Sequence, residues 1–398
     1  MSWRKKTIDD LEVKGRCVFL RVDFNVPMEA DRVANDRRMR ATLPTIRTLV
    51  ERGARLVLAS HLGRPKGPDP RLSLRPVARH LERLLGRPVS FIPEVSGVAV
   101  EEAVRSLPEG GVLMLENVRF HPGEERNDPE LARQWAAWTE VYVNDAFGAS
   151  HRAHASIEAL PRMSPRAVAG YLLRQELEYL IGALEHPMRP FVLVLGGAKV
   201  SDKILLLERL LERVDGILIG GGMAYTFLRV LGQEIGQSLC EGDRLEVAGA
   251  ILEQARKRGL AVELPNDHVV ARALDDPQPP RIVRGPIPEG YMGLDIGPET
   301  AARYAARIEK AGTVLWNGPM GVFEHARFAT GTRAIAEALV RATERGATTI
   351  VGGGDSASAL EAFGMADRVS HVSTGGGAAL ELLEGRLLPG IAVLEDAP

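Results

Sequence analysis

Two lysines that follow a glycine pair are the residues of this chain that most directly suggest chemistry. In the stretch VLVLGGAKVSDK, residues 192–203, Lys199 and Lys203 lie four positions apart, although only eight of the 50 basic residues are lysine. An ammonium group is a compact, rotatable point charge, which suits a phosphoryl group in transfer better than the rigid guanidinium fork does. We expect a helix over residues 202–214 with both ammonium groups on one face. A solvated helix face would explain this stretch equally well.

Basic and short polar side chains follow the strands predicted in the first half of the chain. Arginine binds phosphate or carboxylate oxygens with two parallel hydrogen bonds, and Asn or Asp can bind a hydroxyl. Parallel sheets bind ligands beyond the carboxyl ends of their strands, so these side chains should converge. This half therefore indicates a site for a small, doubly anionic metabolite, formed by Asp23, Asn25, His61, Arg64, Arg119, His121, Arg152 and His154.

Glycines follow the strands predicted in the second half. Glycine lets a flat ligand approach the backbone closely, and a helix that starts there offers free N–H groups to phosphates. The second half therefore indicates a nucleotide site, formed by runs at 196–197, 220–222, 318, 352–354 and 375–377. One such run alone would indicate only a turn.

The motif VGGGDSA leaves two enzyme classes open. Gly352, Gly354 and Ala357 match the dinucleotide fingerprint G-x-G-x-x-A after a strand, which would indicate an NAD-linked oxidoreductase. Asp355 would repel a pyrophosphate unless a metal ion intervened, and Mg²⁺ prefers a carboxylate together with phosphate oxygens. The next strand also lacks the acid that binds an NAD ribose, and no P-loop sequence is present. We therefore favour a Mg²⁺-nucleotide, with phosphoryl transfer to the metabolite.

The elements needed to position these residues are alternating strands and helices. Short runs rich in Val, Ile and Leu alternate with helical patterns, which is typical of α/β folds with parallel sheets covered on both faces. The predicted fold is two doubly wound, Rossmann-like, three-layer lobes. Strands are expected within 16–25, 55–63, 89–94, 111–120, 141–148, 166–173, 191–197, 216–222, 260–270, 312–321, 348–355 and 368–377, and helices at 38–52, 202–214, 244–258 and 332–345.

Length and composition set limits on the function. A chain of 398 residues favours two domains, and 45% hydrophobic with 26% charged residues is ordinary for a globular protein. A net charge of −2 argues against nucleic-acid or membrane-surface partners. Cys17 and Cys240 form no metal or disulfide pattern, and no signal peptide or membrane span is evident. We expect a cytoplasmic monomer.

Eleven stretches in this order resemble the phosphoglycerate kinase family. They are RVDFNVP, RRMRATLPTI, SHLGRP, LENVRFHPGEE, NDAFGASHRAHAS, LGGAKVSDK, GGGMAYTFL, DIGPET, WNGPMGVFE, GGGDSASAL and STGGGA, and they extend from residue 21 to 378. The resemblance implies transfer of a phosphoryl group from 1,3-bisphosphoglycerate to Mg-ADP, giving 3-phosphoglycerate and ATP. A two-lobed binding protein for one metabolite, the non-enzymatic alternative, would leave the lysines and glycine runs unexplained.

The resemblance also implies a role for each matching residue. Catalytic roles fall to Arg38, Lys203, Gly353 and Gly376, and the Mg²⁺ ligand is Asp355. The 3-phosphoglycerate site comprises Asp23, Asn25, Arg38, His61, Arg64, Arg119 and Arg152. The ATP or ADP site comprises Gly197, Ala198, Lys199, Lys203, Gly222, Asn317, Glu324, Gly352, Gly353, Gly354, Asp355 and Ser356. Arg37 could also reach the substrate, but its spacing to the PTI sequence favours Arg38.

The domain arrangement is implied in the same way. A 3-phosphoglycerate lobe would comprise residues 1–171 and 380–398, a linking helix 172–185, and a nucleotide lobe 186–379. The lobes are expected to close around the reacting groups, which excludes water. Asn266 and His268 stand in a stretch that is usually more apolar, and the sequence offers no reason for them.

Overall fold

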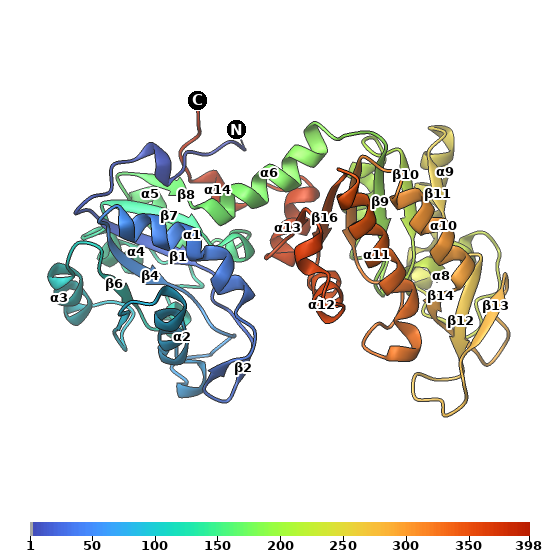
Figure 1. Cartoon of the computed structure of the whole chain (residues 1–398), viewed down its shortest axis with the longest axis horizontal. Coiled ribbons are helices and arrows are strands. Elements are labelled where there is room, and N and C mark those ends of the chain that lie inside the picture. The colour runs from blue at the N-terminus through green and yellow to red at the C-terminus, as the bar shows by residue number, and fades with distance from the viewer. Residues whose placement is uncertain (1–2) are drawn as a thin grey trace. The chain divides into compact units, whose positions relative to one another are not determined.

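The computed structural model describes residues 3–398, which form two compact units (Figure 1). The first unit extends to Glu178 and includes Arg386–Pro398, whereas the second is Tyr179–Gly385. Helix α6 (Tyr171–Glu185) contains the point of division. No helix in the described part of the chain is both long and apolar enough to cross a membrane.

The first unit is built on a six-stranded parallel sheet. Its strands β1, β6 and β7 are buried along their whole length, so helices must cover both faces of the sheet. The strand order is β5-β6-β4-β1-β7-β8. The bounds are β1 (Cys17–Val22), β4 (Arg55–Ala59), β5 (Ser90–Phe91), β6 (Val112–Met114), β7 (Val141–Asp145), β8 (Ala167–Ala169), α1 (Arg37–Glu51), α2 (Arg75–Leu85), α3 (Val98–Ser106), α4 (Pro129–Ala136), α5 (Leu160–Met163) and α14 (Pro389–Ala392).

The second unit repeats this plan. Its parallel sheet has the order β11-β10-β9-β15-β16-β17, and the central strands are again fully buried. The bounds are β9 (Phe191–Leu195), β10 (Gly216–Ile219), β11 (Ala261–Glu263), β15 (Thr313–Asn317), β16 (Thr348–Gly352), β17 (His371–Val372), α7 (Ile204–Leu210), α8 (Met223–Val230), α9 (Leu245–Lys257), α10 (Pro298–Ile308), α11 (Thr330–Glu344), α12 (Gly354–Ala362) and α13 (Gly376–Leu383). The predicted fold class, two doubly wound α/β lobes with parallel sheets, is confirmed.

The strand orders determine where ligands can bind. In the first unit the chain runs from β1 outward through β4 on one side, and then crosses to β7 on the other side of β1. In the second unit it leaves β9 toward β10, and later returns to β15 on the opposite side of β9. Such a reversal opens a crevice at the carboxyl ends of the two strands, where open α/β sheets bind ligands.

One predicted strand is wrong. Residues 260–270 do not form a single strand, because the chain turns after β11 and enters β12 (Asp267–Ala271). Strand β12 is the middle of a separate antiparallel sheet with β13 (Arg281–Arg284) and β14 (Met292–Ile296). The turn explains Asn266, because its side-chain oxygen accepts hydrogen bonds from Thr300 and Arg303 of α10. The Asp267 carboxylate accepts the first backbone N–H groups of the same helix.

The expected helix at 202–214 is also different in the structure. Helix α7 spans only Ile204–Leu210, and Lys203 occupies its N-cap position. Lys199 lies in the preceding loop, so the two lysines do not share a helix face. The glycine pair lets the chain turn sharply after β9, and the apolar helical pattern begins only at Ile204. The other predicted helices agree with α1, α9 and α11 to within two residues at each end.

Candidate active site

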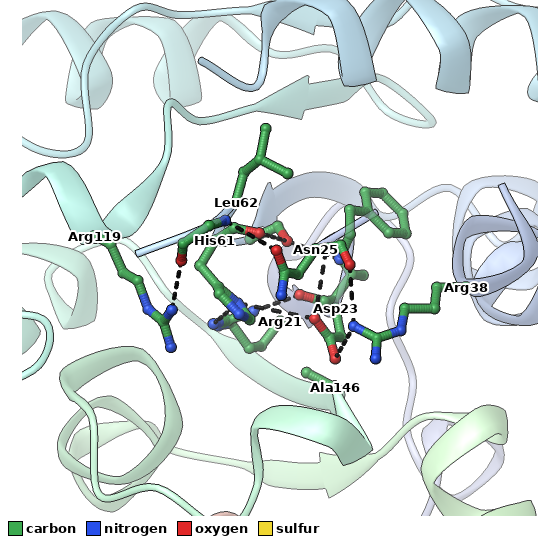
Figure 2. Close-up of polar contacts among 12 residues, drawn as sticks. Arg21, Asp23, Asn25, Arg38, His61, Leu62, Arg119 and Ala146 are labelled. Atoms are coloured by element: carbon green, nitrogen blue, oxygen red, sulfur yellow. Dashed lines mark hydrogen bonds and ion pairs between the residues drawn. The ribbon is translucent and has the colours of Figure 1, made fainter. Parts of the chain in front are cut away.

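The first unit collects its polar side chains at one edge of its sheet. Strands β6, β4, β1 and β7 are neighbours, and each is followed by a residue proposed from the sequence: Arg119, His61, Asp23 and Arg152, respectively. Figure 2 shows Asp23, Asn25, Arg38, His61 and Arg119 drawn together around the end of β1. These side chains converge because the carboxyl ends of neighbouring parallel strands lie at the same edge of the sheet.

Arg38 lies in the first turn of α1 and points toward the strand end. Its Nη1 atom lies 3.2 Å from Oδ2 of Asp23 and donates to the backbone carbonyl of Asn25 at 3.1 Å. The Asn25 side-chain oxygen in turn accepts the backbone N–H of Gly63 at 2.9 Å. The structure therefore places Arg38 in the cluster. Of the two candidates Arg37 and Arg38, this is the one that the spacing favoured. About a third of the Arg38 side chain remains exposed, so it can still meet a ligand.

His61 is held neutral by its surroundings. The side chain is buried, and desolvation together with the positive charges of Arg21, Arg119 and Arg38 holds its pKa well below the usual value. His154 lies in the same field, where desolvation and the Arg119 charge lower its pKa to about 3. Both imidazoles can therefore bind an anion by hydrogen bonding, but neither adds a positive charge near neutral pH.

The remaining arginines of the predicted metabolite site differ in burial. Arg119 is nearly buried, and its Nη1 donates to the carbonyl of Gly63 at 2.6 Å, as Figure 2 shows. Desolvation and the nearby charges of Arg21 and Arg152 lower its pKa. Arg152 is half-buried and contacts the His151 ring at 3.2 Å. Arg64 is exposed on the loop after β4.

Three buried residues behind this cluster, Arg21, Glu124 and Ser156, were not predicted from the sequence. Arg21, the next-to-last residue of β1, is only 1% exposed, and Glu124 and Ser156 are fully buried beside it. A charged residue inside an otherwise apolar buried strand is rare, because burying an unpaired charge is costly. The arginine in CVFLRV was therefore the signal that could have identified this group.

In the second unit, Lys203 and Asn317 meet at the crevice between β9 and β15. The Lys203 ammonium donates to the Asn317 side-chain oxygen. Desolvation lowers the pKa of Lys203, and the negative charges of Asp202, Asp355 and Glu384 partly oppose this shift. The side-chain nitrogen of Asn317 is buried and has no hydrogen-bond partner among residues 3–398.

The glycines of the second unit separate into two kinds. A Cβ on Gly318 would lie 2.2 Å from the carbonyl oxygen of Gly196, and Gly318 also has φ +98°, so the fold itself requires glycine there. Around Gly354, in contrast, an added Cβ would meet no atom within 4 Å; the same holds at Gly197, although Gly197 also has φ +96°. These two positions border open space that a ligand can fill.

Two helix N-termini meet at the glycine runs that follow β16 and β17. Helix α12 begins at Gly354 with Gly353 at its N-cap, and a Cβ on Gly376, the first residue of α13, would lie 2.9 Å from the Gly354 nitrogen. Free backbone N–H groups at such ends favour anions. The Ser356 hydroxyl accepts the Gly318 N–H at 2.6 Å, which joins α12 to the end of β15.

Asp355 is an exposed carboxylate in the first turn of α12, close enough to Lys203 to influence its pKa. The described residues contain no cluster of three acidic, histidine or cysteine side chains that could enclose a metal ion. One exposed carboxylate fits Mg²⁺, which is usually held by one or two carboxylates and by substrate phosphates.

The other predicted nucleotide-side residues lie around these features. Gly222 is the N-cap of α8, and a Cβ there would lie 3.0 Å from the carbonyl oxygen of Ala198. Lys199 lies in the loop after β9, Gly352 is the last residue of β16, and Glu324 is exposed on the loop after β15. The structure thus gathers most of the predicted residues of each half within their own unit.

Comparison with known proteins identifies the chain. The family model for phosphoglycerate kinase matches residues 8–386. The chain is 49% identical over 393 residues to the cytosolic phosphoglycerate kinase of Triticum aestivum, and 51% identical over 395 residues to the phosphoglycerate kinase of Thermosipho africanus, covering 98% of each partner in both cases. The solved structure of phosphoglycerate kinase from Coxiella burnetii matches with a TM-score of 0.89 at 41% identity, covering 98% of both chains.

These matches extend over nearly the whole chain, and they decide between the two enzyme classes that the sequence left open. The predicted transferase is confirmed and the NAD-linked alternative is set aside. The chain belongs to the phosphoglycerate kinase family, a family that uses Mg-ADP and Mg-ATP, and it has phosphoglycerate kinase function.

Proposed function

We propose that the two units divide the substrates, so that the first binds 3-phosphoglycerate or 1,3-bisphosphoglycerate and the second binds ADP or ATP. The observation that carries this proposal is the contrast between the two crevices. One is lined by Arg38, His61 and Arg119, whereas the other is lined by glycine backbone and one half-buried lysine, Lys203. A small anion needs charged side chains around it, and a nucleotide needs room and backbone N–H groups.

In the first unit, Asp23 and Asn25 are assigned to the glycerate hydroxyl end and Arg38 to the reacting carboxylate. His61, Arg64, Arg119 and Arg152 are assigned to the 3-phosphate. Support comes from the 3.2 Å contact between Arg38 and Asp23, which leaves the guanidinium partly exposed beside a carboxylate that can accept a hydroxyl hydrogen. The low pKa of His61 supports a hydrogen-bonding rather than an acid role.

The transfer step needs little from the protein beyond position and charge. In the direction of ATP use, a carboxylate oxygen of 3-phosphoglycerate forms a bond to the γ-phosphorus of ATP, while the bond from that phosphorus to the bridging β,γ oxygen breaks. ADP leaves with the bonding electron pair. A carboxylate is already anionic, so no general base is required. His61 and His151 therefore have no proton to move.

Lys203 and Arg38 are assigned to stabilise the negative charge that spreads over the transferred phosphoryl group. Lys203 lies in a desolvated position, where its charge acts more strongly than in water. Backbone N–H groups at Gly353 and Gly376 add donors from two helix ends, and Gly197, Ala198, Lys199, Gly222, Asn317, Glu324, Gly352, Gly354 and Ser356 are assigned to the nucleotide. Asp355 would hold Mg²⁺, which when bound shares the negative charge of the nucleotide phosphates.

The domain arrangement remains part of the proposal. We assign residues 1–171 and 380–398 to the 3-phosphoglycerate lobe, 172–185 to the linking helix and 186–379 to the nucleotide lobe. Since the two substrates must meet with water excluded, the lobes are expected to close when both are bound. A cytoplasmic location is supported by the names of the wheat and tobacco relatives, which are called cytosolic. A monomer remains our expectation.

A coupled assay tests the proposed reaction. Purified chain with 3-phosphoglycerate, ATP and Mg²⁺ should consume ATP in proportion to 3-phosphoglycerate, and omission of either substrate should abolish the signal. Titration calorimetry with 3-phosphoglycerate, Mg-ADP and NAD should show binding of the first two only. Tight NAD binding without metal, or no ATP consumption, would contradict the proposal.

A further inference from the structure

A buried chain of hydrogen bonds ends on His61, and the reaction scheme above does not use its inner members. The Ser156 hydroxyl lies 2.6 Å from Oε1 of Glu124, and its backbone N–H donates to Oε2 at 2.9 Å. Nε of Arg21 donates to the Ser156 hydroxyl at 2.7 Å. Nη2 of Arg21 lies 3.2 Å from Nδ1 of His61. Figure 2 shows the Arg21 guanidinium against the His61 ring.

The fold brings these four residues together from separate elements. Arg21 is on the central strand β1, His61 follows β4, and Glu124 follows the short helix η3 (Val118–Phe120). Ser156 lies on a π-helical turn, η5 (Ala155–Ala159), and the Tyr142 hydroxyl donates to its carbonyl at 2.8 Å. A π-helical turn is rare and often occurs at functional sites, because it redirects individual side chains.

The direction of each hydrogen bond follows from the donors available. A guanidinium has donors only, so the Ser156 oxygen must accept from Arg21, and its own hydrogen is then directed to the Glu124 carboxylate. For the same reason Nδ1 of His61 must accept from Arg21. A neutral imidazole that accepts at Nδ1 carries its hydrogen on Nε2. The chain of contacts therefore selects one tautomer of His61.

We propose that Glu124 and Ser156 are positioning residues, which orient Arg21 so that His61 is kept as the neutral Nε2–H tautomer and donates to the 3-phosphate of the bound substrate. This inference rests on the proposed function, because it takes the 3-phosphate as the acceptor. The positioning residues themselves do not touch the substrate.

The charges around the chain support a role beyond packing. Glu124 is fully buried, and its Oε1 lies 4.0 Å from Nη2 of Arg21 and 3.8 Å from Nδ1 of His154. It is thus a buried acidic group beside the Arg21 guanidinium and the neutral His154 ring. A buried ion pair of this kind is seldom retained for stability alone, since well-packed apolar residues often stabilise as well. Fixing the geometry of a neighbouring binding residue gives it a function.

The test uses Ser156→Ala in the full-length chain, with Ser164→Ala as the matched control. Ser164 lies in the same unit, and its hydroxyl donates only to the Leu160 carbonyl at 2.9 Å. We expect Ser156→Ala to raise KM for 3-phosphoglycerate about 3- to 10-fold, the effect of one lost hydrogen bond. The kcat value and KM for Mg-ATP should stay within about twofold, a split that loss of stability alone would not produce. The control should leave all three unchanged.

Nitrogen-15 NMR of the histidine rings gives the second reading, in the ligand-free protein. In the wild type, His61 should show a protonated Nε2 and an unprotonated Nδ1, and Ser156→Ala should shift this signal toward a mixture of tautomers. A wild-type His61 with its hydrogen on Nδ1 would overturn the proposal. So would a Ser156→Ala variant with an unchanged tautomer signal and an unchanged KM for 3-phosphoglycerate.

Glu124→Gln is the second variant, because an amide keeps the shape of the carboxylate but cannot accept both Ser156 hydrogens. It should alter the His61 signal in the same direction as Ser156→Ala. If both variants shift the tautomer without changing KM for 3-phosphoglycerate, the positioning role is overturned and the assignment of His61 to the substrate fails with it. Failure of the proposed function as a whole would show differently, as absence of 3-phosphoglycerate-dependent ATP consumption in the wild type.

Discussion

Both units are built on six-stranded parallel sheets, with different strand orders, but they prepare for anions in opposite ways. The first unit uses side chains: Arg21, Arg119 and His61 are all buried, Arg21 lies within hydrogen-bond distance of His61, and Arg119 donates to the Gly63 carbonyl. The second uses backbone, with glycines at the strand ends and two helices that begin side by side. A small metabolite offers few atoms, so it must be surrounded by fixed charges. A nucleotide is larger, and space beside N–H groups suffices.

The charged groups around the two sites also differ. Positive charges in the first unit hold the pKa of His61 and His154 low, so that arginines alone carry the charge. In the second unit Lys203 stands among Asp202, Asp355 and Glu384. In the first site the positive charge therefore rests on arginines, whereas in the second the acidic side chains offset the positive charge of Lys203.

Replacing Lys203 should give the largest effect. We expect Lys203→Ala to lower kcat about 100- to 1,000-fold, because the transition state loses a desolvated positive charge. Affinity for 3-phosphoglycerate should hardly change, since we assign that site to the other unit. Steady-state kinetics and calorimetry measure the two quantities. Near wild-type turnover would show that Lys203 does not act on the transferred group.

The two kinds of glycine should separate in a matched pair of variants. Gly318→Ala should lower the free energy of unfolding by about 2–4 kcal/mol, because of its positive φ and the close Gly196 carbonyl. Gly354→Ala should leave stability nearly unchanged and weaken Mg-ADP binding, since the added methyl group occupies open space at a helix start. Denaturant unfolding and calorimetry with Mg-ADP distinguish them. Equal losses of stability would contradict this division.

Arg152→Ala tests the side-chain site. We expect 3-phosphoglycerate affinity to fall about 10- to 100-fold, the value of a hydrogen bond between charged groups. Mg-ADP affinity should be spared. Arg64→Ala should have a smaller effect, since Arg64 is exposed whereas Arg152 is half-buried. A comparable loss for both ligands would remove the basis for assigning them to separate units.

His268 should give a smaller, pH-dependent effect that is confined to the second unit. Burial lowers its pKa to about 4, the negative charge of Asp267 opposes this shift only partly, and neither ring nitrogen has a hydrogen-bond partner among the described residues. In the unfolded chain His268 takes up its proton near pH 6.5, whereas in the folded chain it does so only near pH 4. The free energy of unfolding is therefore highest above pH 6.5 and decreases as the pH falls toward 4. The loss at pH 5 should be about 1–2 kcal/mol.

His268→Leu should flatten this dependence, because leucine fills the site beside Tyr225 without a titrating group. Thermal unfolding of both proteins at pH 7 and pH 5 is the measurement. If the two Tm values fall equally between these pH values, His268 is not the group responsible.

Much of this architecture could be predicted from the sequence, because buried parallel strands produce unmistakable apolar runs and glycine or basic residues mark their ends. The failures have local causes. Residues 260–270 contain enough apolar residues for one strand, but the Asn266–Asp267 pair caps α10 and sends β12 into another sheet. Lys199 and Lys203 have helical spacing, yet the turn after the glycine pair delays α7. His268 still has no structural explanation beyond its ring contact with Tyr225.

Only the residues at the surface of the candidate site could be predicted from the sequence. Residues such as Arg38 and Asp355 stand in recognisable motifs beside the crevices. Glu124 and Ser156 act through contacts with Arg21 that join segments more than 30 residues apart in sequence. Spacing along the chain carries no sign of such contacts, because the sheet order brings them together.

Hydrogen exchange of the full-length chain with one ligand at a time tests the division of the substrates most directly. With 3-phosphoglycerate alone, added protection should be confined to the first unit, around residues 61–64, 119–124 and 150–156. With Mg-ADP alone, it should be confined to residues 196–203, 317–318 and 352–356. Protection of the glycine runs by 3-phosphoglycerate alone, with none at the arginine cluster, would contradict the account.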